Sequence, residues 1–462
     1  MAGHVFDQIP ELAGVASYTD AARVGYSVDE NVARLLRYHW TERRLMALLV
    51  AHLTAEPVWE VKCALALHQW QCAEHVSALR ARIAEMRHPV PPLDAAPDIA
   101  LDRLLGELLH SVNTAELLAG VYDVAFPALV EAYRAHLAHT NLLVDHPTCR
   151  VLRIALAETD DAIAWGRKAL EVVRDADPEA RRAADEWTTH LRALLDAAGG
   201  IAGDGARTQV ATPGPLRSSR RFTPDFHPQR DERFGGSYNF EFPPHVVYNA
   251  AGVADDERNL ALLCKRALEM DVPEMMASFI TERAEQPWEF HRDYSRQLWD
   301  EARHAMMGTV GLQARGIDWK RDLPLNVSFA LRLNLHATPL ERQVILYAIE
   351  QSLMPAETGK RFEYETARAA GDELSAHFHD YDWADEVLHA QIGRRMLRRD
   401  GITREEAIER AEVIHEKTWA ALDQYRAPAP QLNWWPEFVR RVLGRVGSDV
   451  TIGEERPSIV TE

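Results

Sequence analysis

Two stretches of the sequence, DEARHAMMG (residues 300–308) and DEVLHAQIG (residues 385–393), follow one pattern, D-E-x-x-H-A-x-x-G. Their glutamates stand 85 positions apart (386 − 301). In an α-helix, residues three positions apart lie on the same face, so each stretch predicts a helix that projects a carboxylate and an imidazole together. The small residues after each histidine leave room for a neighbouring helix or a substrate. The projecting pairs are Glu301 with His304 and Glu386 with His389.

One carboxylate and one imidazole on each of two helices supply half of a dinuclear metal site. Two divalent ions need bridging oxygens and charge neutralisation, so the other half has to come from carboxylates on partner helices. A single E-x-x-H would be better explained as a solvated helix face. Two copies of one pattern favour metal binding instead.

The composition indicates a soluble globular protein with room for two or three domains, since 462 residues are 47% hydrophobic and 26% charged. No apolar run reaches the roughly eighteen residues of a membrane span, and the first residues lack a basic start before an apolar stretch. We therefore expect a cytoplasmic protein without a membrane partner. A net charge of −18 argues against a nucleic-acid partner, because phosphate binding needs a basic face.

The four cysteines are scattered along the chain without a C-x-x-C pair. This spacing argues against a disulfide framework, a zinc knuckle and a rubredoxin-type iron centre. We expect these cysteines to be small buried hydrophobic residues.

Helical periodicity runs through nearly the whole chain, for example in residues 31–53 and 340–353, and predicts an all-α protein. The pattern breaks near 199–246, where Gly, Pro, Ser, Arg and aromatic residues replace periodic apolar ones. The expected domains are a helical domain at 1–200, an interdomain linker at 201–245, a metal-binding domain at 246–425 and a C-terminal tail at 426–462.

The two halves of the chain also look related. A shift of 229 positions aligns four residues of the first half with identical residues of the second, which suggests an ancient duplication. The same shift places Cys72 opposite Glu301, and Ala162 takes the position of His389, so we expect the first half to lack a metal. The four identities are Trp59 with Trp288, Glu60 with Glu289, Trp70 with Trp299, and His75 with His304.

The paired motif resembles the ferritin-like dinuclear iron carboxylate proteins, whose oxygen-activating members carry E-x(about 30)-D-E-x-x-H twice. The resemblance covers about residues 245–400 and implies a ferritin-like four-helix bundle that carries the metal site. With the suggested duplication, we expect tandem ferritin-like bundles, the first without a metal. Counting back from each motif, Glu269 lies 32 positions before Glu301 and Glu350 lies 36 before Glu386. Asp300 and Asp385 would orient the histidines. The implied metal ligands are Glu269, Glu301, His304, Glu350, Glu386 and His389.

Two of these ligands have alternatives. On a straight helical wheel, Glu274 faces the apolar side better than Glu269, and Glu357 is an alternative to Glu350. Pro273 and the proline at position 355 predict kinks that make a wheel unreliable, so we favour the family spacing.

The resemblance implies a dioxygen-activating diiron oxygenase or oxidase, with two Fe ions (Mn/Fe as the alternative pair), dioxygen as co-substrate, a small organic substrate and an external electron donor. Natural-product biosynthesis is one setting for such chemistry, and a homodimer is left open. The p-aminobenzoate N-oxygenases of this family have a further histidine ligand where this chain has Asp382, so N-oxygenation is not specifically supported. We interpret His291, His336, His377 and His379 as surface or satisfied polar residues. The alternative function is a non-catalytic iron-handling or partner-binding protein, and no catalytic residue beyond the ligands is predicted.

Overall fold

The structure is a computed structural model that describes residues 4–207, 215–426 and 428–448. Every regular element in these ranges is helical, and they contain no strand, which confirms the prediction of an all-α protein. None of the described helices combines the length and the apolar character that crossing a bilayer requires.

The chain forms two compact units, which we call the first unit (Met1–Leu49 and His68–Thr223) and the second unit (Val50–Leu67 and Pro224–Glu462). These limits differ from the predicted domains, because residues 50–67 belong to the second unit and the predicted linker is divided at Thr223. Buried contacts explain the first difference. Lys62 Nζ lies 2.5 Å from a carboxylate oxygen of Glu274, and the ring of Trp59 lies against that of Trp319.

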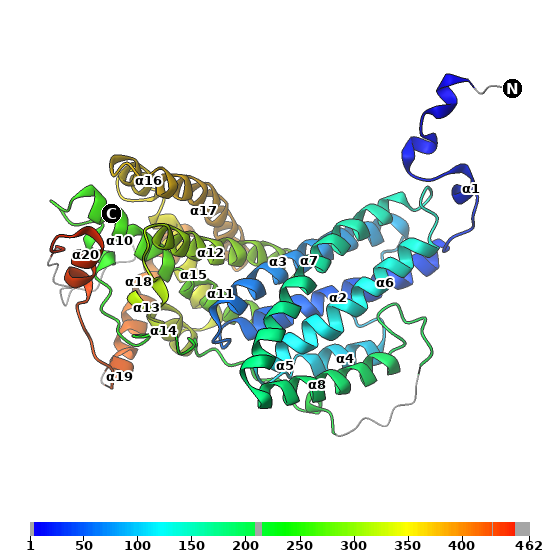
Figure 1. Cartoon of the computed structure of the whole chain (residues 1–462), viewed down its shortest axis with the longest axis horizontal. Helices are drawn as coiled ribbons and strands as arrows, with labels where there is room; N and C mark the ends of the chain where they lie inside the picture. The colour runs from blue at the N-terminus through cyan, green and yellow to red at the C-terminus, as the bar shows by residue number, and fades with distance from the viewer. Residues whose placement is uncertain (1–3, 208–214, 427, 449–462) are drawn as a thin grey trace. The chain divides into compact units, whose positions relative to one another are not determined.

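The first unit is built from helices and a π-helical turn, Gly120–Ala125, that joins two of them. Four of its helices contribute to one buried polar cluster described below. The helices are α1 (Tyr18–Ala21), α2 (Val28–Leu53), α3 (Trp59–Met86), α4 (Ile99–Leu108), α5 (Thr114–Ala119), α6 (Phe126–His139), α7 (His146–Ala176) and α8 (Pro178–Ala197) (Figure 1). The last residues of α2 and the first of α3 are counted with the second unit.

In the second unit, four helical segments close a ring of contacts: α11 meets α12, α12 meets α17, α17 meets α15, and α15 returns to α11. Further helices pack against these four segments: α10 on α12, α16 on α17, α14 on α11 and α18 on α15. The principal helices are α10 (Asp255–Leu268), α11 (Asp271–Glu282), α12 (Trp288–Ala314), α14 (Ser328–His336), α15 (Pro339–Ser352), α16 (Lys360–Ala369), α17 (Glu373–Arg399) and α18 (Arg404–Ala421) (Figure 1). The short helices are α9 (Pro244–Val247), α13 (Trp319–Asp322), α19 (Asp423–Arg426) and α20 (Trp435–Leu443).

Local signals fix where the long helices begin. Thr338 and Glu341 form a capping box at the start of α15, and Asp372 caps α17 by accepting a hydrogen bond from the backbone N–H of Ser375. The break between α10 and α11 falls at Glu269, because Pro273 has no N–H to donate to the Glu269 carbonyl four residues earlier and its ring crowds that group. The predicted kink is therefore a complete interruption of the helix.

The glycine at the end of the first motif sets the distance between two helices. A Cβ on Gly308 would lie 2.3 Å from the backbone nitrogen of Ala267. Only a residue without a side chain allows α12 and α10 to approach so closely. The small residues of the motif thus make room for a neighbouring helix, one of the two roles expected from the sequence.

Candidate metal centre

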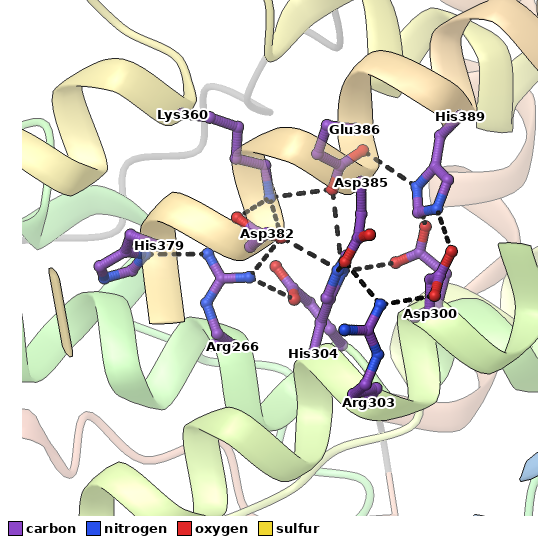
Figure 2. A network of polar contacts seen from close by, with 12 residues as sticks. Arg266, Asp300, Arg303, His304, Lys360, His379, Asp382, Asp385, Glu386 and His389 are labelled. Carbon is purple, nitrogen blue, oxygen red and sulfur yellow. Dashed lines mark hydrogen bonds and ion pairs between the residues drawn. The ribbon is translucent and has the colours of Figure 1, made fainter. Parts of the chain in front are cut away.

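Helices α12 and α17 lie against one another and present their motif residues to a shared buried centre (Figure 2). One ligand atom from each of four residues falls within 4.8 Å of the others, and a second set of three does the same. The six residues predicted as ligands are all members of these two groups. The first group is Glu301, Glu350, Glu386 and His389, and the second is Glu269, His304 and Asp382.

Two glutamates lie between the two imidazoles. Glu301 places Oε1 3.1 Å from Nδ1 of His389 and Oε2 3.7 Å from Nδ1 of His304. Glu386 does the same, with Oε2 3.2 Å from His389 Nδ1 and Oε1 3.9 Å from His304 Nδ1. Each carboxylate therefore offers one oxygen toward either imidazole, which is the geometry that a bridging ligand between two ions requires.

Each motif aspartate contacts the Nε2 of a histidine, the ring nitrogen that faces away from the grouped ligand atoms. The histidine in each case belongs to the other copy of the motif. Nε2 of His304 lies 3.1 Å from Asp385, which belongs to the other copy of the motif. Nε2 of His389 lies 3.4 Å from Asp300. A carboxylate on Nε2 favours the tautomer that leaves Nδ1 free to bind a metal. The structure thus places both aspartates where the resemblance implied.

The remaining two predicted carboxylates lie at opposite ends of the centre. Glu350 joins the His389 group, where its Oε1 accepts a hydrogen bond of 2.9 Å from the amide of Gln297. Glu269 joins the His304 group from the break between α10 and α11. The alternative Glu274 points elsewhere, with Oε1 2.5 Å from Arg230, and Glu357 is exposed.

The electrostatics of the centre fit a bound dication. Burial and the nearby charge of Glu386 raise the pKa of Glu350 well above its ordinary value. Burial disfavours the charged form of His304, but the charge of Asp382 and the contact with Asp385 outweigh it and raise its pKa to about 10. Both pKa shifts favour the protonated forms of these side chains in the metal-free centre, where no divalent ion neutralises the carboxylates.

Unsatisfied atoms give a second, geometric test of that fit. Among the described residues, Oε2 of Glu350 and Nδ1 of His304 are buried without a hydrogen bond of acceptable geometry. Buried polar atoms are normally satisfied, and these two face the grouped ligand atoms. A metal ion on each would satisfy them, so the donor set suits a pair of divalent ions with oxygen and nitrogen ligands.

Asp382 is a further member of the centre that was not predicted as a ligand. It stands where the p-aminobenzoate N-oxygenases have a histidine. Its Oδ1 lies 3.2 Å from Nδ1 of His304, and its side chain is fully buried. It stands four residues before Glu386, one helical turn, and this spacing was the signal that could have identified it as a ligand candidate.

Two cations also line the centre, and sequence periodicity did not indicate either. Lys360 places Nζ 2.9 Å from Asp382 and 3.0 Å from Oε1 of Glu386 (Figure 2). Arg266 lies 2.7 Å from Asp382 and 3.2 Å from Glu269. Both cations therefore contact carboxylates on the His304 side of the centre.

A third group, formed by Glu363, His379 and Asp382, also has metal-like spacing. The guanidinium of Arg266 already fills it, 2.7 Å from Glu363 and 3.1 Å from Nδ1 of His379. Because arginine keeps its charge at any physiological pH, we assign this group to an ion-pair cluster. His379 is buried rather than at the surface, and only its Nδ1 has a hydrogen-bond partner, so the expectation of a surface or fully satisfied residue was wrong.

The first unit contains a related but different arrangement around His75. Its Nδ1 lies 3.0 Å from Glu42 on α2, and its Nε2 lies 2.9 Å from Glu158 on α7. Tyr133 of α6 donates to the same oxygen of Glu42. Burial opposes protonation, but the two carboxylates raise the pKa of His75 to about 9, so an imidazolium joins them at neutral pH. In the described part of the chain, the groups with metal-like spacing all lie in the second unit.

No protein-family model, no curated protein and no solved structure matches this chain.

Proposed function

We propose that this protein is a dioxygen-activating dinuclear iron oxygenase or oxidase that acts on a small organic substrate. The observation that carries the proposal is the position of Glu301 and Glu386, each with one oxygen toward the imidazole of His304 and the other toward that of His389. A structural ion-pair network needs no such two-sided arrangement. Two ions that share bridging carboxylates do.

Under this proposal, the His389 position would be held by His389, Glu350 and the two bridging glutamates. The His304 position would be held by His304, Glu269, Asp382 and the same bridges. When bound, a pair of Fe(II) ions supplies the electrons and open coordination positions that dioxygen activation requires.

The residues around the ligands have separable tasks in this scheme. Asp300 and Asp385 keep Nδ1 of each histidine directed at the centre. Burial and Glu386 raise the pKa of Glu350 in the metal-free protein, and an ion held by this carboxylate would favour its ionised form. The buried surroundings exclude water, which strengthens each of these interactions.

The test is anaerobic reconstitution of the full chain with Fe(II), followed by metal analysis and rapid mixing with dioxygen. We expect up to two irons per chain and transient absorbance from their oxidation. A chain that retains no iron after desalting would refute the proposal. The matched control is a variant with both Glu301→Gln and Glu386→Gln, which keeps the size of both side chains but removes their charges.

Substrate turnover separates an enzyme from an iron-handling protein, the alternative considered from sequence. The reduced, iron-loaded chain is supplied with dioxygen, a chemical reductant and panels of small amines, amides and carboxylic acids. An oxidised organic product formed over several turnovers supports the oxygenase or oxidase. Oxidation of the bound iron without further turnover, with every panel compound unchanged, favours iron handling.

A further inference from the structure

We propose that the two metal positions are unequal because Lys360 acts as a built-in counter-cation of the His304 position. A divalent ion then fills the His389 position first, and a second ion binds only when the ammonium of Lys360 leaves the carboxylates that it holds. This inference rests on the proposed function and adds an order of loading to it.

The contacts of Lys360 are with candidate ligands themselves. Its Nζ lies 3.0 Å from Oδ1 and 2.9 Å from Oδ2 of Asp382, and 3.0 Å from Oε1 of Glu386. That last oxygen is the one that Glu386 directs toward His304. The ammonium therefore occupies oxygens that an ion in the His304 position would need.

The local structure around Lys360 places its side chain in the protein interior. Lys360 is the first residue of α16, and its side chain is 1% exposed although it carries a charge. Its backbone N–H donates to the carbonyl of Leu353, which closes a tight loop after α15. Gly359 makes the loop possible, since a Cβ there would lie 2.1 Å from the Leu353 carbonyl oxygen. A buried ammonium needs carboxylate partners, and Asp382 and Glu386 supply them.

The His389 position has no comparable counter-cation. Among the described residues, Glu301 and Glu350 form no ion pair with a lysine or arginine. Their ion-pair partners are imidazoles, that of His389 for both and that of His304 for Glu301. Arg266 increases the asymmetry, because it too contacts Asp382 and Glu269 on the His304 side. Two cations, Lys360 and Arg266, thus contact candidate ligands on the His304 side of the centre.

Charge repulsion and competition for oxygens follow from this asymmetry. A dication in the His304 position would share Asp382 and Glu386 with the ammonium at close range, where like charges in a poorly solvated core repel strongly. The lysine stem is flexible, and α16 begins directly after a loop, so the ammonium can withdraw. Arg266 is held by three further groups and stays in place as a permanent charge.

The experiment is a titration of the metal-free full chain with Mn(II), followed by electron paramagnetic resonance, which measures free ions, isolated bound ions and spin-coupled pairs. We expect wild type to bind the first equivalent at least about tenfold more tightly than the second, with the spectrum of isolated ions up to one equivalent. Lys360→Met should tighten the second equivalent by about tenfold and produce coupled pairs at lower loading. Lys360→Gln, which keeps a polar group, should do the same, while Lys360→Arg keeps the wild-type order.

Lys265→Met is the matched control, because Lys265 contacts Glu363 and none of the candidate ligands. Its removal should leave both Mn(II) affinities unchanged. His389→Ala should remove the tight site, whereas His304→Ala should leave it. The proposal is overturned if wild type binds both equivalents equally, or if the folded Lys360 variants titrate as wild type does. Absence of any bound Mn(II) or Fe(II) in wild type would instead remove the proposed function, together with the loading order that rests on it.

Discussion

The imidazole Nε2 of His304 lies 3.1 Å from Asp385, an aspartate that belongs to the other copy of the motif. The reciprocal contact joins His389 to Asp300. Each helix therefore depends on its neighbour for the orientation of its own metal-facing nitrogen.

The crosswise pairing predicts position-specific effects. Asp385→Asn should weaken metal binding at the His304 position about tenfold to a hundredfold, because the imidazole loses the carboxylate that fixes its tautomer. Asp300→Asn should have the same effect at the His389 position and thus on the first equivalent. Mn(II) titration of the two variants checks this. Equal losses at both positions in either variant would contradict the assignment.

Glu350 should tolerate loss of its charge in the metal-free protein but not in the metal-bound one. Burial and the charge of Glu386 raise its pKa well above the ordinary value, so the metal-free centre disfavours the charge that this substitution removes. Glu350→Gln should change the free energy of unfolding of the apo protein by less than about 1 kcal/mol, since Gln297 keeps its hydrogen-bond acceptor. Affinity at the His389 position should fall by more than about a hundredfold, beyond the loss expected from a partner that only orients a ligand. Urea unfolding and metal titration of the same variant provide both values.

The motif glycine at position 308 should be essential for the stability of the metal-free protein. Gly308→Ala should lower the free energy of unfolding by about 3 kcal/mol, because the new Cβ would meet the backbone of α10 at Ala267, which cannot rotate away. Gly235→Ala is the control, since a Cβ there meets nothing within 4 Å. Thermal unfolding of both metal-free variants measures the effect. Similar stability of the two would show that α10 and α12 can separate without cost.

The imidazolium of His75 should make stability depend on pH. Its pKa rises from 6.5 to about 9 on folding, so its contribution is fully present below about pH 6.5 and is lost as the pH rises through 9. We expect wild type to lose about 3 kcal/mol more stability than His75→Gln between pH 6.5 and pH 9.5. Urea unfolding over this range tests the difference. Parallel pH profiles for the two proteins would show that His75 is not protonated in the folded state.

The sequence predicted the helical class and the convergence of the motif residues because both depend on regular spacing. An i and i+3 pair shares a helix face wherever the helix lies, so Glu301 with His304 and Glu386 with His389 needed no tertiary information. Glu269 was harder to choose over Glu274, since Pro273 interrupts the helix and a continuous wheel no longer applies.

Lys360 and the unit limits could not be predicted in this way. Lys360 reaches the centre from the start of α16 through a tight loop, so no periodic pattern links it to the ligands that it contacts. Residues 50–67 join the second unit through tertiary contacts such as Lys62 with Glu274, partners that lie 212 positions apart (274 − 62). Local propensity carries no information about contacts at that separation.

The exchange of aspartates between α12 and α17 has a consequence for how such a centre can originate. A helix pair with one D-E-x-x-H motif has an imidazole and a bridging carboxylate, but no aspartate for its own histidine. In this protein each motif aspartate contacts the histidine of the other motif. Two identical copies related by two-fold symmetry would correct this, each lending its aspartate to the other.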